Sequence, residues 1–164
     1  MKRALFGLFS VFLMAATAST AFAAPGHDGG HANSPIGKAG DPKKVSRTIE
    51  VVMNDRMRFL PDKVTVKPGE TIRFVVRNSG RLLHELVIGT PEELRAHAEL
   101  MKKHPGMEHD EPYMAHVAAG RRGELVWHFN RPGTFQFACL LPGHFEAGMV
   151  GTLVVTPVSP EKKP

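Results

Sequence analysis

Apolar and polar residues alternate along several short segments between residues 45 and 158. Val64 and Val66 alternate with polar residues before a Pro-Gly turn, and Ile72, Phe74 and Val76 do the same after it. Alternation with a period of two, bounded by turn residues, is typical of strands with one buried face. By this criterion we expect strands within 47–55, 62–80, 81–89, 123–130, 133–139 and 148–156. Short strands at this spacing predict an all-β fold, a β-sandwich.

One segment of the domain departs from this alternation. Residues 90–104 begin with Thr90 as a candidate N-cap, Pro91 at the first helical position and Glu93 completing a capping box. Residues 105–120 are rich in Gly, Pro and polar groups and are expected to form a loop. The sandwich is therefore predicted to carry a helix-and-loop insertion near residues 90–120.

The first 23 residues have the pattern of a secretory signal peptide. A short basic head is followed by an apolar run over 4–17 and a small-x-small cleavage site that ends at Ala23. The apolar run is shorter than the ~20 residues that a membrane-spanning helix needs. We expect an exported, periplasmic chain that has no stable membrane insertion after cleavage.

The remaining chain divides by composition. Residues 24–44 lack apolar periodicity and are predicted to be a disordered leader. The folded domain is expected over 45–158, followed by a C-terminal tail over 159–164. The formal net charge of +5 includes no basic cluster of the kind that nucleic acid requires, so we expect no nucleic-acid partner. We also expect the chain to be a monomer.

The chain has a single cysteine, Cys139, and it lies in a short segment with unusual chemistry. His144 follows five residues later and Met149 five residues after that. Thiolate, imidazole and thioether groups are ligands that suit copper, and a trigonal blue-copper site uses two histidines, one cysteine and a weak axial methionine. His84, on the apolar face of an earlier predicted strand, is the best candidate for the second histidine.

Other uses of a lone cysteine agree less well with these residues. A structural zinc site usually takes several cysteines, and a dinuclear copper centre would need two bridging ones. A Cys–His hydrolase is possible in principle, because a nucleophile and its base need only lie close in space. Such an enzyme would leave Met149 without a role, and we expect no enzymatic activity.

The segments 59–89 and 133–155 resemble the cupredoxin family. The Cys-x4-His-x4-Met spacing is similar to that of rusticyanin, and residues 84–112 resemble the periplasmic copper-tolerance cupredoxins of the CopI type. The resemblance implies a Greek-key β-sandwich, one type 1 copper ion per chain and no substrate turnover. It maps the copper ligands onto His84, Cys139, His144 and Met149.

The resemblance also directs attention to the surroundings of these ligands. Glu85 stands where azurin-like proteins have asparagine, so it is either a neighbour that tunes the copper or an outward-facing surface residue. Leu141, Pro142 and Phe145 surround His144 in the sequence and are expected to form an apolar electron port. A transient periplasmic redox or copper-handling protein would dock there.

The insertion is rich in histidine and methionine. A second, weaker copper site is a hypothesis for His97, Met101, His104, Met107, His109, Met114 and His116. Core packing for Met101 and solvated histidines is the alternative. His27 and His31 in the leader could likewise hold a loose ion or simply be solvated.

Two functions remain open from the sequence. The first is a dedicated electron carrier between periplasmic redox proteins. The second is a copper-tolerance protein that binds, buffers or oxidises periplasmic copper. The insertion and the CopI-like stretch favour the second, and one-electron chemistry is compatible with both.

Overall fold

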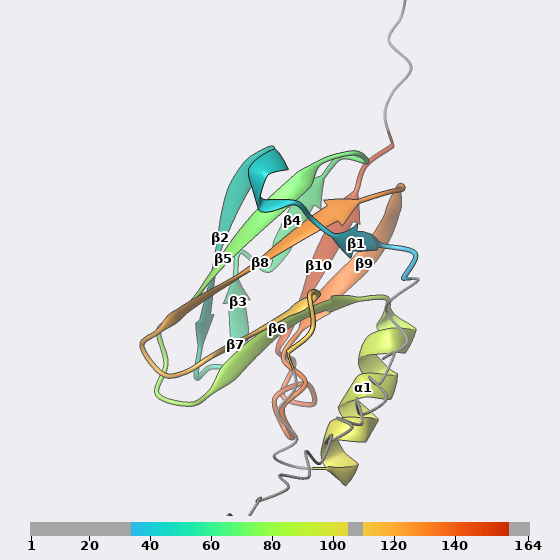
Figure 1. Ribbon diagram of the computed structural model, residues 1–164. Helices are drawn as coiled ribbons and strands as arrows, with labels where there is room; N and C mark the ends of the chain where they lie inside the picture. The colour runs from blue at the N-terminus through green and yellow to red at the C-terminus, as the bar shows by residue number, and fades with distance from the viewer. Residues whose placement is uncertain (1–33, 105–109, 158–164) are drawn as a thin grey trace, which may run out of the picture.

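The computed structural model describes residues 34–104 and 110–157, which form a sandwich of two five-stranded sheets (Figure 1). The first sheet has the strand order β1-β8-β5-β2-β3 and the second β4-β10-β9-β6-β7. The strands are β1 (Gly37–Ala39), β2 (Arg47–Asn54), β3 (Arg58–Leu60), β4 (Lys63–Val66), β5 (Thr71–Asn78), β6 (His84–Gly89), β7 (Met114–Val117), β8 (Arg122–Phe129), β9 (Gly133–Ala138) and β10 (Val150–Val155). The predicted all-β sandwich with a helical insertion is confirmed.

The helical part of the insertion is α1 (Pro91–Lys103). Thr90 accepts from the Glu93 amide and its own amide donates to the Glu93 carboxylate, so the predicted capping box is present. The helix buries one face, which carries Leu94, His97, Ala98 and Met101, against the second sheet. None of the helices in the described ranges is long and apolar enough to cross a bilayer.

The structure differs from the sequence-based expectation at three places. Strand β3 lies between the predicted strands 47–55 and 62–80 and was not expected. Residues 37–44, within the predicted leader, form β1 and a 3-10 helix (Pro42–Lys44), and β1 pairs with β8. The ordered domain therefore begins before residue 45, since Ile36 is fully buried and anchors this segment. The expected loop over 105–120 contains β7, whose backbone pairs with β6 although its sequence is too short to show alternation.

Both faces of β6 are buried, which the alternation in its sequence did not indicate. One face packs into the sandwich core, and α1 lies near the strand on the other side. Burial of consecutive side chains on one strand requires cover on both sides of the sheet. The insertion thus contributes to the cover over β6.

The core between the sheets is held by aromatic side chains close to the end of β9. The rings of Phe59 and Phe137 meet edge to face with centroids 5.1 Å apart. Gly151 on β10 pairs with Phe137, and a Cβ at Gly151 would lie 2.2 Å from the Phe137 ring. The glycine is therefore needed for the ring to lie flat against β10.

Replacing Gly151 with alanine is expected to lower the free energy of unfolding by about 1–3 kcal/mol, because the added methyl group overpacks a fixed aromatic ring. Chemical denaturation of the metal-free protein measures this change. In a Phe137→Leu background the same substitution should cost less, since the smaller side chain leaves room for the methyl group. An equal cost in both backgrounds would show that the Phe137 ring is not the cause.

Candidate metal centre

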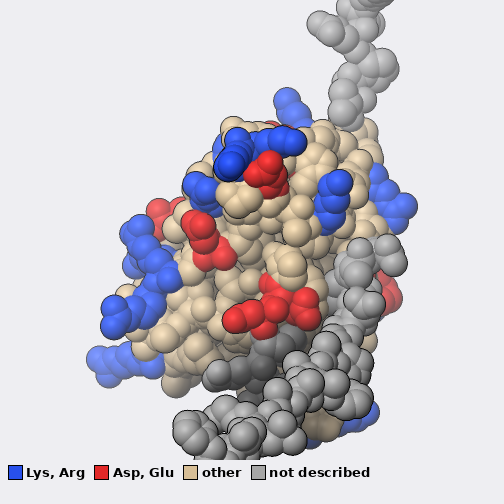
Figure 2. Space-filling model, in the orientation of Figure 1, with Lys and Arg blue, Asp and Glu red and all other residues tan. Residues whose placement is uncertain are grey.

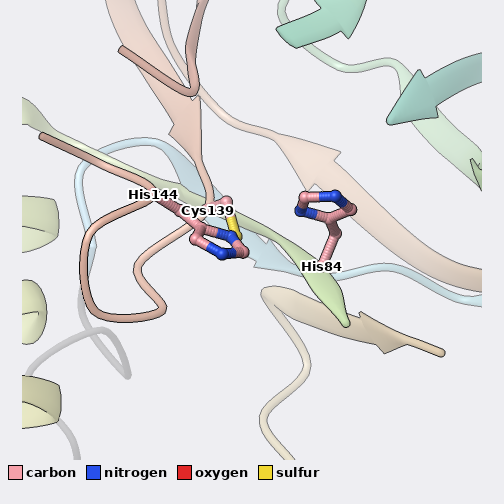
Figure 3. Close-up of side chains that lie close together, drawn as sticks. All are labelled: His84, Cys139 and His144. Atoms are coloured by element: carbon pink, nitrogen blue, oxygen red, sulfur yellow. The ribbon is translucent and has the colours of Figure 1, made fainter. Parts of the chain in front are cut away.

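Three of the four predicted copper ligands come together at one end of the sandwich (Figure 3). His84 begins β6, Cys139 follows the last residue of β9, and His144 lies in the loop between β9 and β10. One ligand atom from each residue lies within 4.8 Å of the others. Nδ1 of His144 is 3.2 Å from the sulfur of Cys139, and the two imidazole centroids are 4.9 Å apart.

The pairing of β9 with its neighbours brings these residues together. Ala138 pairs with Val87 of β6 on one side and with Val150 of β10 on the other. Strand β9 runs antiparallel to both of these neighbours. The residue after Ala138 therefore lies near the start of β6, and it also lies near the residue that precedes β10. Cys139 and Met149 therefore approach each other, and the Cys139 amide donates to the Met149 carbonyl at 3.1 Å.

Backbone hydrogen bonds fix the loop that carries His144. The His144 amide donates to the Leu141 carbonyl at 2.9 Å, and the His144 carbonyl accepts from the Met149 amide at 3.0 Å. Gly143 and Gly148 have φ values of +87° and +88°. Residues that have a Cβ rarely adopt positive φ values of this kind. The loop is thus a sequence of tight turns that aims the imidazole back toward Cys139.

Met149 is fully buried between Cys139 and β10. Its backbone is held to both Cys139 and His144 by the hydrogen bonds described above. The structure therefore places the Met149 backbone next to two of the candidate ligands.

The donor groups of these residues are better suited to binding a metal ion than to hydrogen bonding with one another. Nδ1 of His84 is buried and has no hydrogen-bond partner within the described chain, which is costly unless a ligand satisfies it. Burial, and then the nearby charge of Glu85, raise the pKa of the Cys139 thiol to about 12. A coordinated cation would deprotonate such a thiol outright. Copper fits this set of two imidazoles and one sulfur.

The imidazole of His144 is kept in the form that binds metal. Partial burial, and then the neighbouring His84, lower the pKa of His144 below its usual range. A neutral imidazole has a free nitrogen lone pair, whereas a protonated one must first release its proton. The geometry and the electrostatics therefore both favour metal binding.

Glu85 points into the protein rather than to solvent. Its side chain is fully buried; one carboxylate oxygen accepts from the Leu140 amide at 2.7 Å, and the other lies 2.7 Å from Nε2 of His116. The Glu85 amide also donates to the Cys139 sulfur at 3.5 Å. The alternative of an outward-facing residue is excluded, because β6 is covered on both sides.

The expected electron-port residues line the loop next to His144. Leu141 and Phe145 are partly buried and pack against the core, whereas Pro142 is exposed. Leu82 and Leu83, immediately before His84, are 47% and 42% exposed and add apolar surface at the start of β6. Their use in docking stays a prediction.

The residues predicted to form a second copper site are spread over different environments. His97, Met101 and Met114 are buried and His104 is exposed, while Met107 and His109 lie outside the described residues. His116 lies against Glu85. Among the described histidines, cysteines and acidic residues, only the group of His84, Cys139 and His144 is close enough to share an ion. The second site stays a prediction.

Three contacts of the centre were not expected from the sequence. Asp55 lies 3.1 Å from Nε2 of His84. Arg58 donates to the carbonyls of Ala147 and Gly148, and Lys102 of α1 forms an ion pair with Glu146 at 2.6 Å. Each contact joins segments that lie far apart in the chain. A charged residue in the sequence does not by itself indicate which distant segment it will contact.

Comparison with known proteins agrees with this geometry. A family described as "Copper binding proteins, plastocyanin/azurin family" matches residues 45–156. The chain is 52% identical to the copper-resistant cuproprotein CopI of Rubrivivax gelatinosus over 147 residues, covering 84% of this chain and 89% of that protein. It is 35% identical to the copper-resistant cuproprotein CopI of Pseudomonas aeruginosa, covering 85% and 90%.

Solved structures show the same fold. Auracyanin B is similar with a TM-score of 0.62 and 24% identity, covering 74% of this chain and 96% of that one. An azurin from Methylomonas sp. strain J has a TM-score of 0.53 at 17% identity, covering 68% and 99%.

Because Cys139 is fully buried and its pKa is about 12, the thiol of the metal-free protein should resist alkylation at pH 8. Iodoacetamide modification followed by mass spectrometry measures this, and the same protein in denaturant should react at least tenfold faster. Rapid modification of the folded chain would contradict the burial of the thiol.

Proposed function

The chain belongs to the plastocyanin/azurin family of copper-binding proteins, and we propose that it protects the periplasm against copper by one-electron chemistry at a type 1 copper ion. His84, Cys139 and His144 are the three strong ligands in this proposal, and Met149 is the weak axial ligand. The observation that carries it is the convergence of three ligand atoms within 4.8 Å, and His84 also has a buried Nδ1 without a hydrogen-bond partner among the described residues.

Copper, when bound, supplies a centre that gains and loses one electron. The chain itself supplies a rigid set of ligands. The hydrogen bonds among Cys139, His144 and Met149 hold their backbones in one arrangement, and Cys139 and Met149 are fully buried. If the ligands do not move when the charge of the ion changes, the reorganisation energy of electron transfer stays small.

The surroundings of the Cys139 sulfur exclude water, and a backbone amide donates a hydrogen bond to this sulfur. The Glu85 amide contacts the thiol, and the Glu85 carboxylate holds the Leu140 amide next to it. Hydrogen bonds and low polarity around the cysteine sulfur tune the potential of such copper sites. Glu85 therefore acts on the copper through the position of the Cys139 segment.

The copper-tolerance role is supported by the relatives named as copper-resistant cuproproteins, which match along most of their length. The periplasm is supported by the signal-peptide pattern of residues 1–23, which lie outside the described residues. The partner in this proposal is a transient redox or copper-handling protein that meets the apolar surface near His144. A dedicated electron carrier between periplasmic redox proteins is the alternative, and the same group of ligand residues would serve it.

Adding one equivalent of Cu(II) to the metal-free protein should produce an intense visible band from charge transfer between the Cys139 thiolate and copper. The Cys139→Ser variant should lack this band, because the alkoxide of serine does not replace a thiolate as a soft ligand. Absorption and electron spin resonance record both spectra. Met149→Leu, which keeps the volume, should retain the band with a shifted maximum. A wild-type spectrum without a thiolate band would refute the copper site.

Copper stoichiometry separates the two roles. If the chain is a tolerance protein that uses its insertion, equilibrium dialysis should find more than one copper per chain in the wild type. The excess should disappear in the His104→Ala/His109→Ala variant and persist in the matched His27→Ala/His31→Ala variant. One copper in all three proteins would favour the dedicated carrier.

A further inference from the structure

A carboxylate outside the predicted ligand set contacts the candidate ligand His84 at Nε2, the ring nitrogen other than the unpartnered Nδ1. Asp55 lies in the turn after β2, and its Oδ1 is 3.1 Å from Nε2 of the His84 imidazole. The imidazole is fully buried, whereas the Asp55 side chain is 36% exposed. Because Nε2 meets this carboxylate, Nδ1 is the ring nitrogen that remains for a ligand.

The turn between β5 and β6 holds Asp55 in place. The Arg81 amide donates to Oδ2 at 2.7 Å and the Leu82 amide to Oδ1 at 3.3 Å. Gly80 allows this approach, because a Cβ there would lie 1.9 Å from Oδ1 of Asp55. The carboxylate therefore sits in a cradle of backbone amides that admits no side chain at residue 80.

A buried asparagine fixes the shape of this cradle. Asn78 is 1% exposed, and its amide nitrogen donates to the carbonyls of Leu82 and Val117 at 2.7 and 2.9 Å. Its side-chain oxygen accepts from the Gly80 amide at 2.8 Å. All three bonds orient the segment that leads into His84, so the position of Asp55 relative to the imidazole is set by the fold.

The hydrogen-bonding chemistry then decides the state of His84. An ionised carboxylate is only an acceptor, so the Nε2 atom that meets it must carry a proton. The amides of Arg81 and Leu82 donate to Oδ2 and Oδ1, so both carboxylate oxygens act as acceptors. In a neutral imidazole with Nε2 protonated, the lone pair is on Nδ1, the nitrogen that is buried without a partner.

We propose that Asp55 is a positioning residue of the copper site, which selects the Nε2-protonated tautomer of His84, fixes its ring and makes Nδ1 a stronger donor. This inference rests on the proposed function. A carboxylate behind a ligand histidine raises its basicity, and the added negative charge favours Cu(II) over Cu(I). Asp55 thus biases the centre toward the oxidised ion.

The first test uses the metal-free protein, so it does not depend on copper. In wild type, nitrogen-15 NMR of His84 at neutral pH should show a single tautomer with the proton on Nε2. Asp55→Asn should give a mixture, because an amide offers one oxygen to a cradle in which both carboxylate oxygens accept. Asp62→Asn removes the same charge at an exposed site and should leave His84 unchanged.

The second test measures the copper-loaded proteins. Asp55→Asn should lower the ratio of Cu(II) to Cu(I) affinity about tenfold, at the lower end of the effect of such partners on metal affinity. For a one-electron couple this is a rise of about 59 mV in reduction potential. Gly80→Ala keeps the carboxylate but displaces it, and should shift the potential in the same direction. Asp62→Asn should have the wild-type potential.

The outcomes distinguish the inference from the function on which it rests. Asp55→Asn and Gly80→Ala with the wild-type tautomer and potential would overturn the role of Asp55 while leaving the copper site intact. If wild type forms no thiolate–copper band, the proposed function fails and the tautomer measurement alone decides on Asp55. If Asp55→Asn does not fold, as judged by circular dichroism, Gly80→Ala supplies both readouts.

Discussion

The arrangement of the candidate copper site depends on the register of β9 between β6 and β10. Ala138 pairs with both neighbours, so the chain leaves the sheet at Cys139 with the start of β6 on one side and Met149 on the other. A shift of one residue would turn every side chain on β9 to the opposite face. The buried aromatic residues of β9, above all Phe137 against Phe59, oppose such a shift. Core packing and ligand geometry are therefore consequences of the same pairing.

The insertion has a structural effect on the site that is independent of any second copper. Its His116 lies 2.7 Å from the buried Glu85 carboxylate, and through Lys102 and Glu146 it is attached to the loop that carries His144. Two carboxylates, Asp55 and Glu85, contact the ligand segments. Figure 2 shows basic and acidic groups interspersed on one face of the molecule. Negative charge close to the centre favours the divalent ion most strongly, because the interaction scales with the ion's charge.

The sequence predicts the parts of this structure that depend on residue type and short-range pattern. Alternation locates most of the strands, and the capping box locates α1. The convergence of Cys139, His144 and His84 is predictable because soft donors on one short loop have few other uses. The inward orientation of Glu85, the strand β7 and the contact of Asp55 with His84 depend on tertiary packing. The local alternation of apolar and polar residues does not show whether a further layer covers the outer face of a sheet. It also does not show which turns contact each other in the fold.

In the proposed function one copper ion is bound by the sulfur of Cys139 and by two imidazoles. X-ray absorption at the copper edge, on protein loaded with one equivalent of Cu(II), measures the ligand atoms directly. We expect a first shell with a single short copper–sulfur distance and two copper–nitrogen distances. A first shell of nitrogen and oxygen atoms without sulfur would contradict it, and would place the ion at the histidines of the leader or the insertion instead.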